Sequence, residues 1–105
     1  GGANLLVRDK GIRGVVIYTG RLQSIIHEGN RLRVAAGVST AKAAKTAMKH
    51  GLSGMEFAAG IPGTIGGAAY MNAGAYNGEM ADIVVSVLSC NRNGQLSVYN
   101  KSKLH

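Results

Sequence analysis

The residues best placed to do chemistry in this sequence are backbone groups in one glycine-rich segment between Ala58 and Ala68. The segment reads AAGIPGTIGGA, and its glycines stand at positions 60, 63, 66 and 67. Glycine adopts backbone conformations closed to other residues and carries no side chain that would hold a ligand away. Successive N–H groups in such a loop form a concave anion site, and a helix that begins there adds its dipole. A diphosphate is the natural occupant.

The spacing of the glycines excludes the two common phosphate-binding loops. No two glycines in the chain are two positions apart, so the dinucleotide-binding pattern G-x-G-x-x-G is absent. No Gly-Lys-Ser or Gly-Lys-Thr triplet occurs either, which excludes the Walker A loop. A structural alternative stays open from the residues alone, in which these glycines and alanines serve only close packing of the backbone.

A second, weaker candidate loop opens the chain at Gly1-Gly2-Ala3-Asn4-Leu5. Its N–H groups could also meet an anion, and the two loops together could hold opposite sides of one extended ligand. Other chemistry is not evident. The single cysteine, Cys90, falls in a predicted strand, so we expect a buried structural thiol. Three scattered histidines give no metal-ligand spacing, and no pair of carboxylates stands out as an acid and base.

Length and composition limit the domain that carries these loops. The chain has 105 residues, which suits one small domain, and its low aromatic content of 5% together with sixteen glycines predicts a thin core. The net charge of +7 favours anionic partners, and a lone cysteine fits a reducing compartment. We expect no secretory signal and no transmembrane helix, because the least charged stretch, 57–75, contains a proline and five glycines.

Short strands are expected on both sides of the glycine-rich zone. Apolar and β-branched runs predict them at 4–7, 14–18, 22–27, 31–36, 82–89 and 95–99. The sequences Glu28–Arg31 and Asn91–Gly94 are typical of hairpin turns. The alternation of 31–34 predicts a strand with one face in solvent.

One helix is expected before the glycine-rich zone, over Thr40–His50. Ser39 is placed to cap its N-terminus, and Gly51 follows where a left-handed residue is needed. Three lysines share one face, which we interpret as solvated, and the opposite face is apolar. The residues of that apolar face are Ala43, Ala44, Ala47 and Met48.

The longest motif of the chain resembles a family of bacterial flavoenzymes. Residues 51–67, GLSGMEFAAGIPGTIGG, and 70–76, YMNAGAY, look like the UDP-N-acetylenolpyruvoylglucosamine reductases, which make UDP-N-acetylmuramate for peptidoglycan. The opening GGANLLV is similar to the family's G-G-S-N-L-L-V, with Ala3 in place of the usual serine. That replacement loses one hydroxyl and keeps the backbone N–H groups. The resemblance covers essentially the whole chain.

The resemblance implies an α+β fold with FAD as cofactor and NADPH as co-substrate. The expected fold is a partial FAD-binding domain of the p-cresol methylhydroxylase/vanillyl-alcohol oxidase type, with small mixed sheets, one clear helix and a C-terminal β-hairpin. The two glycine loops would approach the FAD diphosphate from opposite sides, which favours a ligand role over packing alone. The implied cofactor-binding residues are Gly1, Gly2, Ala3, Asn4, Leu5, Gly60, Ile61, Pro62, Gly63, Thr64, Gly66, Gly67, Asn72, Ala73, Gly74 and Ile83, with Val84 a further candidate at the adenine half.

The same resemblance assigns no catalytic residue to this chain. In the family an Arg and a Glu stabilise the enolate formed from the UDP-sugar substrate, and a Ser donates the proton. All three are expected beyond His105. We therefore expect 1–105 to be a fragment of the FAD-binding domain, cut from a larger cytoplasmic bacterial protein, without its substrate-binding domain and N-terminal segment, and inactive alone. Open strand edges of the fragment would allow self-association.

Two alternatives to this function are open from the sequence, one that keeps the fold and one that is not an enzyme. The chain could belong to another flavin oxidoreductase of the same superfamily, such as an oxidase. A basic nucleic-acid-binding module would explain the charge, but the positive residues are spread over every zone and lack interleaved aromatics. We therefore expect neither nucleic acid nor a membrane as partner.

Overall fold

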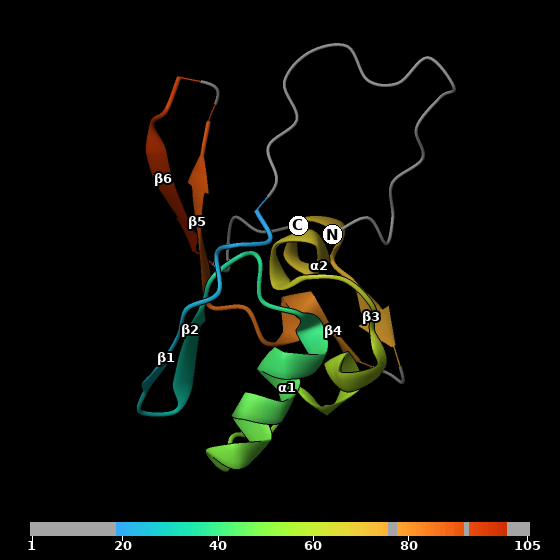
Figure 1. Ribbon diagram of the computed structural model, residues 1–105. Helices are drawn as coiled ribbons and strands as arrows, with labels where there is room; N and C mark the ends of the chain where they lie inside the picture. The colour runs from blue at the N-terminus through green and yellow to red at the C-terminus, as the bar shows by residue number, and fades with distance from the viewer. Residues whose placement is uncertain (1–18, 76–77, 92, 101–105) are drawn as a thin grey trace, which may run out of the picture.

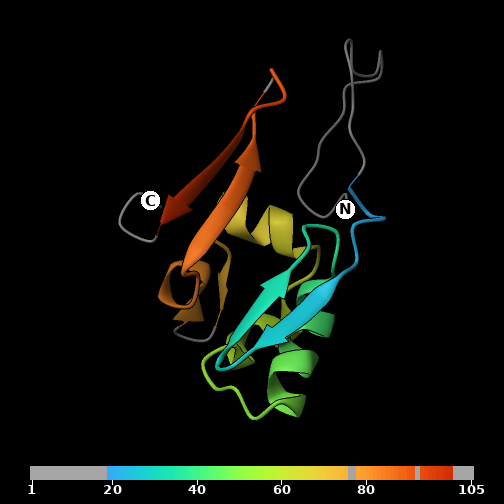
Figure 2. The same cartoon turned by 90° about the vertical axis from the view of Figure 1, so that its left-hand side faces the viewer.

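The computed structural model describes residues 19–75, 78–91 and 93–100, and this part is α+β as predicted. Figure 1 shows the helices with short hairpins around them, and in Figure 2 the C-terminal hairpin extends away from the helices. The predicted strands at 4–7 and 14–18 lie outside the described residues. The elements in chain order are β1 (Ile25–Glu28), β2 (Arg31–Val34), α1 (Thr40–Lys49), the 3-10 helix η1 (Glu56–Gly60), α2 (Ile65–Met71), β3 (Gly74–Ala75), β4 (Gly78–Glu79), the 3-10 helix η2 (Met80–Asp82), β5 (Ser86–Cys90) and β6 (Leu96–Asn100).

The sheets of the described part are three antiparallel pairs, β1–β2, β3–β4 and β5–β6, so the mixed sheets that we expected are not found there. In β1–β2, Glu28 pairs with Arg31 across the predicted two-residue turn, where Gly29 has a φ of +62°. Strand β1 begins later than the predicted residue 22. A turn precedes it, closed by the Leu22 N–H, which donates to the Thr19 carbonyl at 2.9 Å; the Gln23 side chain donates to the carbonyls of Gly20 and Gly37 at 2.7 and 2.8 Å.

The C-terminal hairpin forms as predicted, but its thiol lies on the surface. The turn is closed by Asn91, whose Oδ1 accepts the N–H groups of Asn93 and Gln95 at 2.9 and 3.0 Å. Strand β5 begins later than the predicted residue 82 because η2 occupies that position. Cys90 is exposed, so the prediction of a buried thiol is wrong. It pairs across the hairpin with Leu96, itself 67% exposed, where β5 and β6 extend away from the helices (Figure 2).

Helix α1 forms where its caps predict it. The Ser39 Oγ accepts the N–H of Lys42 at 3.0 Å, and Gly51, after the last turn, has a φ of +69°. Ala43, Ala44 and Ala47 are buried and the three lysines are exposed, as expected. Met48 is 72% exposed, so its assignment to the apolar face is wrong. Measured round the helix from Ala43, Ala47 lies at about 40° and Ala44 at about 100°, whereas Met48 lies at about 140°, beyond the edge of this narrow alanine face.

A second helix, α2, was not predicted, because it begins Ile65-Gly66-Gly67 and glycine is a poor helix former. Contacts outside the helix hold its first turn. The N–H groups of Ile65 and Gly66 donate to carbonyls of the segment before α1, at 2.8 and 2.9 Å. The helix ends at Asn72, which adopts the left-handed conformation with a φ of +48°.

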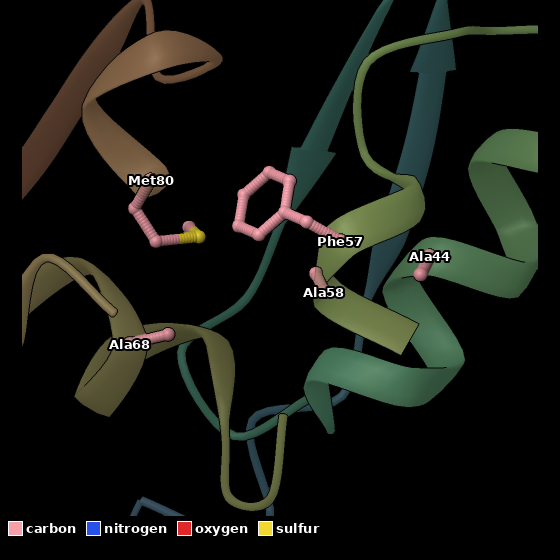
Figure 3. Close-up of a cluster of buried hydrophobic side chains, with 5 residues drawn as sticks. All are labelled: Ala44, Phe57, Ala58, Ala68 and Met80. Atoms are coloured by element: carbon pink, nitrogen blue, oxygen red, sulfur yellow. The ribbon is translucent and has the colours of Figure 1, made fainter. Parts of the chain in front are cut away.

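The core is thin, as predicted, and lies between α1, η1, α2 and η2. Figure 3 shows the Phe57 and Met80 side chains pointing toward one another, with alanines from three elements around them. Most of the buried apolar residues in the described part are alanines, so each contributes little buried area. The central cluster consists of Ala44, Phe57, Ala58, Ala68 and Met80.

Gly66→Ala is expected to destabilise the chain. A Cβ at Gly66 would lie 2.8 Å from the Cβ and 3.1 Å from the carbonyl oxygen of Ala36. The crowding should lower the free energy of unfolding by about 1–3 kcal/mol, as for an overpacked core. Urea unfolding followed by circular dichroism measures this change.

Gly60→Ala is the matched control for this prediction. A Cβ at Gly60 meets nothing within 4 Å, and its φ is not positive. Its free energy of unfolding should therefore stay within about 0.5 kcal/mol of the starting value. Equal losses in the two variants would contradict the assignment of Gly66 to packing.

Candidate functional site

The glycine-rich segment 60–67 is held against the residues that precede and begin α1. Ser39 and Thr64 stand opposite one another in an isolated antiparallel bridge. Hydrogen bonds flank the bridge on both sides, so two stretches far apart in the sequence form one short ladder. The donors are the N–H groups of Thr40, Ile65 and Gly66, and the acceptors are the carbonyls of Gly63, Val38 and Ala36, at 3.1, 2.8 and 2.9 Å.

The glycines of the segment serve different purposes. Gly63 has a φ of +100°, which glycine alone adopts readily, and Gly66 makes room for Ala36. Gly60 would have open space around a Cβ, and a Cβ at Gly67 would meet only the Thr64 Oγ1, at an ordinary 3.6 Å. Packing and conformation therefore explain two of the four glycines. The other two are exposed and leave their backbone open to a ligand.

Few amides of the segment are available to an anion. The N–H groups of Ile65 and Gly66 donate within the ladder, and that of Gly67 lies 3.4 Å from the Thr64 Oγ1 that caps α2. Pro62 has no N–H. Within the described ranges, the N–H groups of Gly63 and Thr64 have no hydrogen-bond acceptor. The amides available for the predicted anion site are therefore those of Gly63 and Thr64, next to the exposed backbone at Gly60.

The predicted ligand residues 72–74 also hold the fold together. The Asn72 Oδ1 accepts the N–H of Ala81 at 2.8 Å, which ties the end of α2 to η2. The carbonyl of Ala73 accepts the N–H of Met80 at 2.9 Å. Gly74 lies in the β3–β4 pair, where a Cβ would stand 2.8 Å from the carbonyl oxygen of Gly78. Contact of these residues with a ligand stays a prediction.

The structure gathers several of the predicted residues round one core. Ile61, Ala73, Ile83 and Val84 are partly buried against the central cluster, so their side chains contribute to the core. The loop 1–5 lies outside the described residues and is not placed relative to them.

Among the residues that the structure describes, no group of three His, Cys, Asp or Glu side chains could hold a metal ion. In the same part of the chain, every helix is too short or too polar to cross a membrane.

Thr40 is a residue of the site that sequence reasoning missed. It has no exposed surface, although it is polar, and its Oγ1 donates to the carbonyl of Ile61. Its own N–H donates to the carbonyl of Gly63. The sequence offered one weak signal, a small polar residue directly after the helix cap. The acceptor stands 21 positions further along the chain, so no local pattern could identify it.

Comparison with known proteins gives a family and named relatives. A family described as "FAD binding domain" matches residues 1–99. A UDP-N-acetylenolpyruvoylglucosamine reductase of Clostridium novyi is 46% identical over 103 residues, which are 98% of this chain and 34% of that protein. The protein of the same name from Lactobacillus acidophilus is 49% identical over 97% of this chain and 34% of that protein. One in Limosilactobacillus fermentum is 50% identical over 90% of this chain and 31% of its own length.

Asn72→Ala is expected to destabilise the end of α2 for two reasons. It removes the acceptor of the Ala81 N–H, and it places a residue with a Cβ and no polar group at a φ of +48°. Together these should lower the free energy of unfolding by about 1.5–3 kcal/mol in urea unfolding.

Asn72→Gly separates the two causes, since glycine accepts the left-handed conformation but offers no side-chain acceptor. We expect it to lose about 0.5–1.5 kcal/mol, the contribution of the hydrogen bond. A glycine variant as unstable as the alanine variant would show that the conformation of residue 72 contributes nothing.

Proposed function

The chain belongs to the FAD binding domain family, and we propose that it is the FAD-binding part of a UDP-N-acetylenolpyruvoylglucosamine reductase. It spans 34% of the length of the Clostridium novyi relative that carries that name, so the activity proposed is that of a longer protein. One observation of the structure carries the proposal. The amides of Gly63 and Thr64 lack acceptors among the described residues, next to a glycine with open space around it. A diphosphate needs such donors and such close approach.

In this proposal the backbone, rather than charged side chains, recognises the diphosphate. The segment 60–67 contains no charged residue, so its contribution comes from amide dipoles and shape. The net charge of +7 attracts the dianionic diphosphate over longer range. Gly1 to Leu5 would close over the diphosphate from the other side, and Asn72 to Gly74 and Ile83 would lie further along the cofactor. The domain type would be that of p-cresol methylhydroxylase and vanillyl-alcohol oxidase.

Bound FAD would supply hydride transfer from NADPH to the enolpyruvyl group of the UDP-sugar. The carbon–carbon double bond takes up that hydride and one proton, which gives UDP-N-acetylmuramate for bacterial peptidoglycan in the cytoplasm. The described residues bind and orient the cofactor. None of them is proposed as the proton donor, since the groups that do this work belong to the rest of the longer protein.

Gly67→Ala tests whether that glycine is there for a ligand. A Cβ at Gly67 has room, and alanine is the better helix former, so the free energy of unfolding should rise by about 0.5–1 kcal/mol. If the exposed backbone at residue 67 meets FAD, the same methyl group should weaken FAD binding about tenfold, a change of 1.4 kcal/mol.

Titration of FAD fluorescence measures the binding, and urea unfolding measures the stability. The opposite signs of the two effects make the outcome specific. A variant that is more stable and binds FAD as well as the original chain would remove Gly67 from the proposed site.

A chimera tests the activity of the longer protein. The residues of the Clostridium novyi reductase that match this chain are replaced by the chain itself, and the unmodified reductase is the control. We expect the chimera to retain FAD, seen as yellow colour, and to oxidise NADPH only with UDP-N-acetylenolpyruvoylglucosamine present. The isolated chain should oxidise no NADPH under the same conditions. A chimera that binds FAD but ignores this substrate would favour another flavin oxidoreductase.

A further inference from the structure

We propose that Thr40 is a positioning residue for the FAD-binding segment: it draws two carbonyls of the segment inward and thereby turns the Thr64 N–H outward to FAD. The inference rests on the proposed function and adds a residue that lies outside the segment itself. Thr40 would not touch FAD. It would act through the backbone of residues 61–64.

The first step of the argument is the burial of Thr40. Thr40 is the first residue of α1, and although its side chain is polar it has no exposed surface. A buried hydroxyl without a partner is unfavourable, and this one donates to the carbonyl of Ile61. The N–H of the same residue donates to the carbonyl of Gly63 at 3.1 Å. One residue therefore fixes two carbonyls that flank Pro62.

The second step follows from the planarity of the peptide bond. The carbonyl of Gly63 and the N–H of Thr64 belong to the same peptide unit, and in a trans peptide they point in opposite directions. The described residues contain no cis peptide bond. Because the Gly63 carbonyl faces Thr40, the Thr64 N–H must face away from α1. It has no acceptor within the described ranges and is therefore available to donate to a ligand.

The third step concerns the peptide between Ile61 and Pro62. Its carbonyl also faces Thr40, and its nitrogen belongs to proline, so this peptide turns no N–H outward when its carbonyl turns inward. Pro62 itself is exposed. The positive φ of Gly63 then brings the chain into register for the ladder with 36–40. The hydroxyl of Thr40 thus selects one shape of the segment at a point where glycine alone would permit several.

The test compares four proteins: the original chain, Thr40→Val, Thr40→Ser and Thr46→Val. Valine keeps the shape of threonine and removes the hydroxyl, whereas serine keeps the hydroxyl. Thr46 is the matched control, because it lies on the same helix and its Oγ1 donates at 2.8 Å to the carbonyl of Lys42 rather than to the segment. FAD binding is measured by fluorescence titration, at a temperature where circular dichroism shows that each protein is folded.

We expect Thr40→Val to bind FAD about tenfold more weakly, and Thr40→Ser and Thr46→Val to stay within about twofold of the original chain. Equal binding by Thr40→Val would overturn the inference alone. An equal loss of FAD affinity in Thr46→Val would also overturn it, because that would indicate general weakening of α1. An equal loss in Thr40→Ser would overturn it as well, because that would indicate that only the methyl group matters. No FAD binding by the original chain, either alone or within the Clostridium novyi chimera, would overturn the proposed function and this inference with it.

A second measurement does not depend on any variant. Amide hydrogen exchange followed by NMR reports the Thr64 N–H directly, with the Gly66 N–H as internal reference, because the latter donates to the Ala36 carbonyl. We expect Thr64 to exchange rapidly without FAD and about tenfold or more slowly with it, while Gly66 stays protected throughout. Protection of the Thr64 N–H without FAD would overturn the inference, because that amide would already be paired within the protein.

Discussion

The described structure depends on one short antiparallel ladder between residues 36–40 and 63–66. Its hydrogen bonds join residues more than twenty positions apart in the sequence. None of these bonds belongs to the internal hydrogen bonding of a helix or to a strand pair longer than one bridge. The ladder fixes where α2 begins, since two of its donors are the first amides of that helix. It also brings η1 and α2 over the alanine face of α1, which forms the core (Figure 3). The ladder is therefore the constraint that gives a thin core a defined arrangement.

The elements with local causes could be predicted from the sequence, and those with distant causes could not. Helix α1 has its cap at Ser39, and the β5–β6 hairpin has its turn at Asn91, so both causes lie within a few residues. Helix α2 has two glycines in its first turn and forms because carbonyls from before α1 accept its amides. The buried position predicted for Cys90 was wrong for a related reason. Strand chemistry shows that a residue is in a strand, but not what covers that face of the strand.

Glycine spacing and the family resemblance both predicted a ligand site at residues 60–67. The FAD binding domain family matches residues 1–99, a range that includes this segment but does not single it out. The sequence could not separate a glycine required by conformation, such as Gly63, from one required by packing, such as Gly66. That distinction depends on the position of Ala36, which lies against Gly66 in space but far from it in the sequence. The sequence did not identify Thr40 for the same reason, since its role comes from its hydrogen bond to the carbonyl of Ile61, which is distant in the sequence.

The proposed binding segment, made of backbone amides, places a particular demand on the rest of the fold. A lysine or arginine can adjust its side chain to an anion, whereas an amide can only be aimed by fixing the peptide unit to which it belongs. Glycine makes close approach possible but also gives the segment its freedom, and that freedom must be removed by contacts from outside. The ladder and the buried hydroxyl of Thr40 do this for residues 61–66. The small side chains of α1 and α2 then have a clear role, because alanine allows these backbones to come close enough for the ladder to form.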